Sequence, residues 1–195
     1  MLGKIRVVPK EIDTGREQML LFLCCALGVG WGMLAGRLAM PLECWMGPAL
    51  FLLVIMAVLS QRPFYAGVNT MAFFICLFVN GHVYSTLVPG GYEMLQETLL
   101  RLLWVVGATA LGTVLWAAKG ETKPAMVIAG LAAGLQLPLI WLSLQQGWFF
   151  PVLDLSLLLV MVLLLQKSRV KRLTTAVFAL LGGVLYLFLV LAFRL

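Results

Sequence analysis

Residues 18–37 read QMLLFLCCALGVGWGMLAGR, a run with no charged side chain before Arg37. An apolar helix of about 20 residues crosses the hydrocarbon layer of a bilayer, which is roughly 30 Å thick. Because no water satisfies backbone groups there, only helices and closed barrels span it, and barrel strands would alternate in polarity. The unbroken apolar run therefore predicts a transmembrane helix.

The same character extends along the whole chain. Of its 195 residues, 63% are hydrophobic and 11% are charged, and the mean hydropathy is +1.04. Soluble proteins carry about a quarter charged residues. We therefore expect an all-α membrane protein, a bundle of about seven transmembrane helices. The predicted spans are residues 18–37, 45–60, 67–88, 99–118, 124–143, 151–166 and 173–193. The second and sixth are short, so the count is six if one of them is re-entrant.

The basic residues predict the orientation of the bundle. With the N-terminus inside, the cytoplasmic segments hold eleven Lys and Arg residues, whereas the opposite side holds only Arg37, Arg101 and Arg194. Lys and Arg in short loops are retained on the cytoplasmic side. We expect a cytoplasmic N-terminus and an outer C-terminus, with a basic N-terminal segment, residues 1–17, before a single transmembrane domain, residues 18–195. The first span lacks the short apolar core and cleavage site of a signal peptide.

Charge and cysteine content exclude several classes of protein. The net charge of +6 is explained by topology, so we expect no nucleic-acid partner, and the basic loop 166–173 suits contact with anionic lipid headgroups. The loops are too short to fold alone. Cys24, Cys25 and Cys76 lie in predicted spans and Cys44 lies in a short outer loop, without a C-x-x-C motif. We therefore expect no metal, cofactor or disulfide.

The first span carries Gly28, Gly32 and Gly36 at intervals of four. This spacing places small residues on one helix face, where a second helix approaches closely. The face predicts either packing against another helix of the same chain or docking of a separate membrane protein.

Polar residues inside spans mark candidate sites, because each is costly in lipid unless it is paired. Asn80 and Gln136 lie at similar predicted depths, His82 lies slightly further out, and Asp154 lies about one turn below the outer surface. An outward-facing polar pocket from Asn80, His82, Gln136 and Asp154 is geometrically feasible.

Each of these residues also has a structural explanation. Asn80 and Gln136 are equally suited to hydrogen bonds between helices. His82 is suited to the membrane interface. Asp154 follows Pro151 and is suited to capping a helix.

An enzyme is not expected. The chain has no H-E-x-x-H or G-x-S-x-G motif, and its single His and single intramembrane Asp leave too few groups for acid–base chemistry.

The stretch SQRPFYAGVNTMAFFICLFVNGHVYS, residues 60–85, and WAAKG, residues 116–120, resemble a family of small bacterial multi-spanning proteins known only as a domain of unknown function. The resemblance covers about residues 20–190. It implies a bacterial inner membrane and supplies no activity or site residues.

A weaker likeness is to the substrate-binding subunits of energy-coupling-factor vitamin transporters, which dock through small residues of their first helix. Those subunits usually have six spans, and seven are predicted here. Two functions follow as expectations. One is a non-enzymatic protein of the inner or plasma membrane that binds or moves a small molecule. The other is a structural or regulatory subunit that docks another membrane protein or a second copy of this chain.

Overall fold

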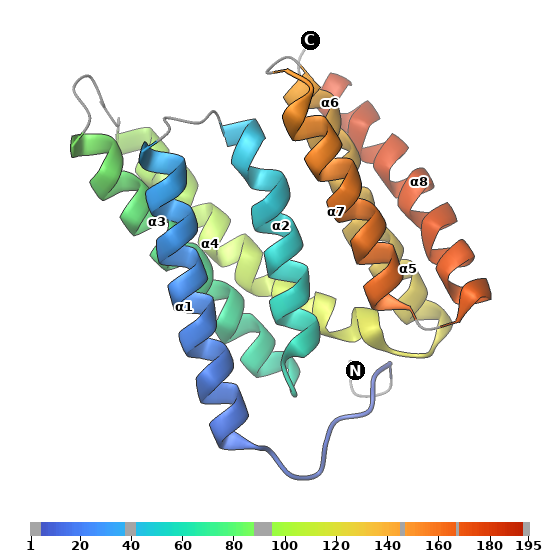
Figure 1. Cartoon of the computed structure of the whole chain (residues 1–195). Coiled ribbons are helices and arrows are strands. Elements are labelled where there is room, and N and C mark those ends of the chain that lie inside the picture. Colours follow the sequence, from blue (N-terminus) through green and yellow to red (C-terminus); the bar gives the residue numbers. More distant parts are fainter. Residues whose placement is uncertain (1–4, 38–41, 88–94, 145–146, 167, 193–195) are drawn as a thin grey trace.

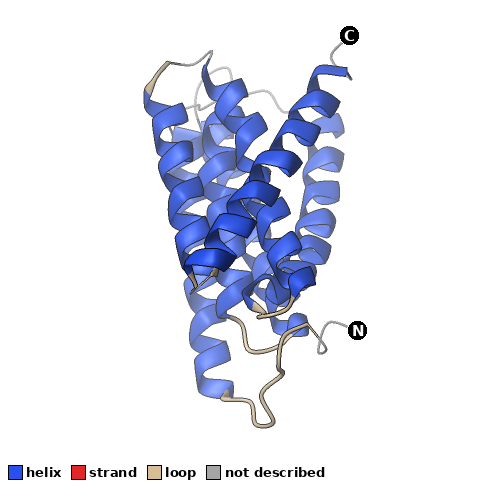
Figure 2. Ribbon diagram, turned by 90° about the vertical axis from the view of Figure 1, so that its right-hand side faces the viewer, coloured by secondary structure: helices blue, strands red, loops and turns tan. Residues whose placement is uncertain are grey.

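The computed structural model describes residues 5–37, 42–87, 95–144, 147–166 and 168–192, and every regular element within them is helical (Figure 2). The elements are α1 (Thr14–Arg37), α2 (Leu42–Leu59), α3 (Pro63–Leu87), α4 (Leu95–Leu115), the 3₁₀ turn η2 (Trp116–Lys119), α5 (Lys123–Gly134), α6 (Gln136–Ser143), α7 (Phe149–Leu165) and α8 (Arg169–Ala192). Because only Leu135 separates α5 from α6, these two helices form one interrupted rod. The described residues thus form seven rods, which confirms the all-α prediction.

The rods run alternately up and down, so neighbours along the chain are antiparallel (Figure 1). Five helices are long and apolar enough to cross a membrane, residues 14–37, 63–84, 101–119, 123–143 and 169–188. Two shorter apolar helices, Met46–Leu59 and Phe149–Leu165, correspond to the two segments predicted to be short. The helices begin up to four residues earlier than the predicted spans, because a helix continues beyond the apolar residues that hydropathy detects.

Helix α2 is the centre of the bundle and contacts α3, α4, α6 and α7. From residue 46 to residue 59 its side chains are apolar on every face, and Ala49, Leu53 and Ala57 are fully buried. Small residues at two of these positions let neighbouring helices approach closely. On one side of α2 lie α1, α3 and α4, and on the other lie α6 and α7, with α5 and α8 beyond (Figure 1).

The three glycines of the first span face α3. A Cβ built on Gly28 would overlap the backbone carbonyl oxygen of Phe73, and one on Gly32 would overlap that of Leu77. A Cβ on Gly36 would lie 2.8 Å from the Cβ of Tyr84. The small residues therefore serve the α1–α3 interface within the chain.

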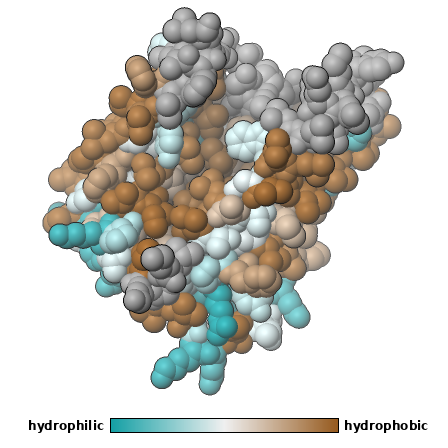
Figure 3. Space-filling view, turned by 180° about the vertical axis from the view of Figure 1, so that it is seen from behind, coloured by the Kyte–Doolittle hydropathy of each residue, from teal (hydrophilic) through white to brown (hydrophobic). Residues whose placement is uncertain are grey.

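The outer surface is dominated by apolar side chains, whereas hydrophilic residues gather toward the end of the bundle that carries the N-terminus (Figure 3). On α1, Met19 and Phe22 are about three-quarters exposed, and Phe188 of α8 is nearly as exposed. An apolar surface of this extent is unfavourable in water and favourable against lipid.

Residues 5–13 lie outside the helices and pass beneath the lower ends of the bundle (Figure 1). The Arg6 guanidinium donates a 2.8 Å hydrogen bond to the Trp116 carbonyl and another to the Ser60 carbonyl, and it stacks 4.6 Å from the centre of the Trp116 ring. Gln61 and Asp13 exchange two hydrogen bonds of 3.0 Å. This N-terminal segment is thereby tied to the α2–α3 turn and to η2.

Candidate functional site

Gln136 and Asp154, two of the polar residues selected from the sequence, lie on either side of Gly47 in α2. Gln136 Nε2 donates a 2.9 Å hydrogen bond to the Gly47 carbonyl oxygen. A Cβ built on Gly47 would overlap the Asp154 carboxylate, so this carboxylate occupies the space left by the missing side chain. Both polar side chains are fully buried. One glycine therefore brings α2, α6 and α7 together around two polar groups.

The buried carboxylate is short of hydrogen-bond donors. Ser143 in the last turn of α6 lies beside Asp154, and its single hydroxyl proton can go either to the Asp154 carboxylate or to the Ile140 carbonyl, which is 3.1 Å away. Within the described part of the chain, no donor other than the Ser143 hydroxyl lies beside the Asp154 carboxylate, and Oε1 of Gln136 has no donor. We call Gly47, Gln136, Ser143 and Asp154 the Gly47 site. Among the described residues, its three acceptor oxygens have at most one donor, the Ser143 hydroxyl.

If the Gly47 site only held the helices together, its unpaired acceptor oxygens would lower the stability of the fold. A buried acceptor without a partner costs about 1–3 kcal/mol, and an unpaired ionised carboxylate costs more. The cost falls if Asp154 takes up a proton, or if a cation or an N–H donor lies against the oxygens. The chemistry of the Gly47 site therefore favours a positively charged or proton-donating species.

All three helices around the Gly47 site contain a proline, although only the rod formed by α5 and α6 is interrupted, at Leu135. Each carries a proline within four residues of the site: Pro48, Pro138 and Pro151. Proline removes a backbone donor and displaces the preceding turn. In α6 this accounts for the break at Leu135, one residue before Gln136. Interrupted helices near the middle of a membrane are typical of sites where transporters hold ions and substrates.

The structure overturns the capping interpretation of Asp154. Helix α7 begins at Phe149, its N-cap residue is Trp148, and no side chain caps it. Asp154 is thus the sixth residue of the helix, beyond the first turn whose amides lack partners. The capping interpretation failed because Pro151 lies inside the first turn and does not precede it.

Asn80 and His82 do not join Gln136 and Asp154. Both belong to α3, which lies on the opposite side of α2 from α6 and α7 (Figure 1). Asn80 Nδ2 donates a 2.8 Å hydrogen bond to the Cys76 carbonyl of its own helix. The four residues expected in one pocket are therefore divided between two places.

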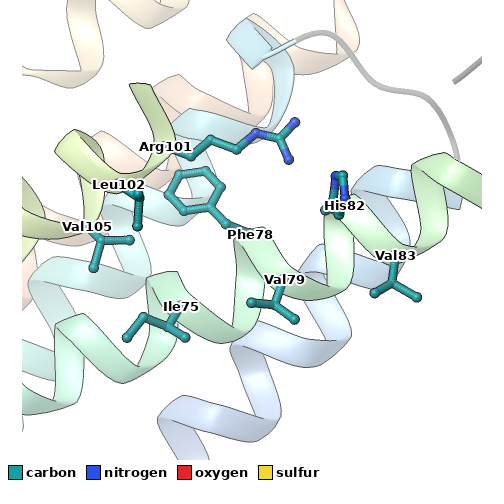
Figure 4. Close-up of a pocket in the computed structure, with 8 residues that line it drawn as sticks. All are labelled: Ile75, Phe78, Val79, His82, Val83, Arg101, Leu102 and Val105. Atoms are coloured by element: carbon teal, nitrogen blue, oxygen red, sulfur yellow. The ribbon is translucent and has the colours of Figure 1, made fainter. Parts of the chain in front are cut away.

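His82 instead borders a groove between α3 and α4, with a volume of about 240 Å³ (Figure 4). Arg101 lies across this groove with its guanidinium 5.9 Å from the centre of the Phe78 ring. The other lining residues are aliphatic: Ile75, Val79, Val83, Leu102 and Val105. A shallow apolar groove on the outer surface of the bundle is suited to a hydrocarbon chain rather than to a polar substrate.

Sequence reasoning missed Gly47 and Ser143. Ser143 is a single hydroxyl near a helix end and gives no signal. Gly47 was detectable, because Gly47-Pro48 is a helix-weakening pair inside an otherwise apolar span. Prolines close to Gln136 and Asp154 repeat the same signal in two further spans.

The thiol groups form no metal site within the described residues, where no group of three or more His, Cys, Asp or Glu side chains could hold an ion. Cys24 is buried, whereas Cys25 of α1 and Cys76 of α3 are half-buried and lie beside each other across the α1–α3 interface. The side chain of Cys44 lies outside the described residues.

The chain matches no protein-family model, no curated protein and no solved structure. Its function is accordingly inferred from the residues of the Gly47 site.

Proposed function

We propose that this chain is a non-enzymatic multi-pass protein of a bacterial inner membrane that binds, and helps to move, a small cationic species at the Gly47 site. The proposal rests on three buried acceptor oxygens, two on Asp154 and one on Gln136, which have at most one donor among the described residues, the Ser143 hydroxyl. Burying an ionisable side chain within a membrane costs free energy. Such a residue is therefore, by default, a candidate for a functional role.

Full burial limits the size of the species. Asp154 and Gln136 have no exposed surface, so a ligand that reaches them through the packed helices is a proton, an alkali-metal ion or the tip of a small ammonium group. Asp154 provides the counter-charge and the Gln136 carbonyl oxygen provides a neutral ligand. The break at Leu135 between α5 and α6 supplies local freedom for entry and exit.

The proposed orientation follows the basic residues, with seven spans, the N-terminus in the cytoplasm and the C-terminus outside. Asp154 then lies roughly 8 Å below the outer start of α7, at a rise of 1.5 Å per residue. The Gly47 site is in the outer half of the membrane in this arrangement.

The test compares the response of the purified protein to cations before and after Asp154→Asn. Thermal unfolding is followed in detergent at fixed ionic strength in sodium, lithium, potassium or choline chloride, at pH 6 and pH 8. We expect the wild type to be stabilised by one of these cations or by protons. Asp154→Asn should abolish that response while the protein remains folded, because asparagine has nearly the same size and keeps an oxygen that can accept from the Ser143 hydroxyl.

Ser156→Ala is the matched control, because Ser156 lies on the same helix, is exposed and bonds only to the Val152 carbonyl of its own helix. It should leave the response unchanged. A wild type that is insensitive to every cation and to pH would contradict the proposal. An Asp154→Asn variant that unfolds would favour a purely structural cluster.

The alternative, docking of a separate membrane protein through Gly28, Gly32 and Gly36, has less support. These residues are in contact with α3, so docking through them would require α1 and α3 to separate. The opposite face of α1 is open, since nothing lies within 4 Å of a Cβ built on Gly30. No observation indicates what would cover that face.

A further inference from the structure

A second cavity, of about 350 Å³, lies at the lower end of the bundle among the N-terminal segment, η2, the end of α7 and the start of α8. The charged side chains that line it are Arg6, Lys119, Lys171 and Glu121, which gives a formal charge of +2. We infer that this cavity, the basic pocket, binds the phosphate group of an anionic phospholipid. The inference assumes the proposed membrane location and does not depend on the Gly47 site.

Arg6 carries the strongest argument for an anion. Its side chain is half-buried, and its guanidinium donates hydrogen bonds to two neutral backbone carbonyls, those of Trp116 and Ser60. Among the described residues it forms no ion pair with a carboxylate. Burial, and then the charge of Arg16, lower the pKa of Arg6. The group nevertheless stays charged at neutral pH, so a nearby anion would offset its desolvation.

The other basic groups reach the basic pocket from separate parts of the chain. Lys119 ends η2 and Lys171 lies in the first turn of α8. Ser168, directly before α8, adds a hydroxyl at the same rim. The start of a helix provides unpaired backbone amides and a positive dipole end, which favour phosphate. Cations on three segments that meet in one cavity are suited to a group with several charged oxygens.

The position of the basic pocket favours a lipid over a free phosphate. Leu164 borders the cavity and is 55% exposed on the apolar outer surface of α7. An acyl chain can therefore lie along α7 while its headgroup enters the pocket. Basic pockets between helices on the cytoplasmic side of a membrane are known to hold anionic headgroups.

The test is native mass spectrometry of the full chain, titrated with dioctanoyl phosphatidylglycerol or dioctanoyl phosphatidylcholine. We expect the wild type to bind one phosphatidylglycerol about tenfold more tightly than phosphatidylcholine. Lys119→Gln with Lys171→Gln should lose about tenfold in affinity for phosphatidylglycerol. Arg6 is left intact because its replacement would also detach the N-terminal segment.

The matched control is Lys123→Gln with Arg169→Gln, which removes the same charge from exposed residues at the same end of the bundle that do not line the pocket. It should retain wild-type affinity. Equal losses in both double variants, or no headgroup preference in the wild type, would overturn the inference. Displacement of the lipid by millimolar inorganic phosphate would support phosphate recognition and overturn the lipid as its source.

Discussion

The side-chain amide of Gln136 donates a 2.9 Å hydrogen bond to the backbone carbonyl of Gly47, and it does so where the Asp154 carboxylate enters from the other side. This contact joins α6 to α2 and leaves the second amide atom, Oε1, without a donor. Gln136 therefore has two roles that can be separated: its nitrogen holds helices together, and its oxygen is available to a ligand.

Gly47→Ala should lower the free energy of unfolding by about 1–3 kcal/mol, because the added methyl group would overlap the Asp154 carboxylate. Thermal unfolding in detergent measures the loss. Gly30→Ala is the control, since its Cβ meets nothing and alanine favours a helix by up to about 1 kcal/mol. Combining Gly47→Ala with Asp154→Ala should restore most of the stability. A single Gly47→Ala variant as stable as the wild type would contradict the packing described for the Gly47 site.

Gln136→Leu should cost about 1 kcal/mol of stability, the typical upper range for a hydrogen bond between membrane helices. The loss arises at the Gln136 nitrogen, which bonds to Gly47. Asp154→Asn should cost less, because the one described donor beside the carboxylate is the Ser143 hydroxyl, to which the asparagine oxygen can still bond. Unfolding curves of the two variants, recorded side by side, check this order. The reverse order would mean that Asp154 holds the helices together and is not available to a ligand.

The helices were predictable from the sequence, whereas their lateral order was not. Hydropathy reports how deep a residue lies along a helix, and it correctly located the spans that carry Asn80 and Gln136. It does not report which helices are neighbours, because apolar side chains cover the faces toward lipid and toward other helices alike. The central position of α2 separates α3 from α6 and α7, so two residues expected together lie apart.

The Gly47 site was predictable in part. Gln136 and Asp154 were identified by the cost of burying polar groups in lipid. Their common contact with Gly47 depends on the close approach of three helices, which no local pattern encodes. The insertion of Arg6 beneath the bundle was equally hidden, because residues 5–13 have neither helical periodicity nor a recognisable turn.

Gly32→Leu should unfold or strongly destabilise the protein, since a Cβ at this position already overlaps the Leu77 carbonyl and backbone cannot move aside. Gly30→Leu, two residues away on the open face of α1, should be tolerated. Thermal unfolding and size-exclusion chromatography of both variants distinguish packing from docking. If Gly32→Leu keeps its stability and loses only a co-purifying membrane protein, the face of α1 that carries Gly32 is a docking surface instead.

Mild oxidation with copper phenanthroline should link Cys25 to Cys76 within one molecule, because these thiols lie beside each other across the α1–α3 interface. Gly28, one turn after Cys25, brings the backbones close, since its Cβ would lie 2.9 Å from that of Cys76. Peptide mass spectrometry without reduction detects the link, and Cys25→Ser should abolish it. Cys24→Ser is the matched control and should leave the link intact, because Cys24 is buried on a neighbouring face of the same helix. Cross-links that form only between molecules would mean that α1 packs against a second copy of the chain, and the glycine face would then belong to an oligomer.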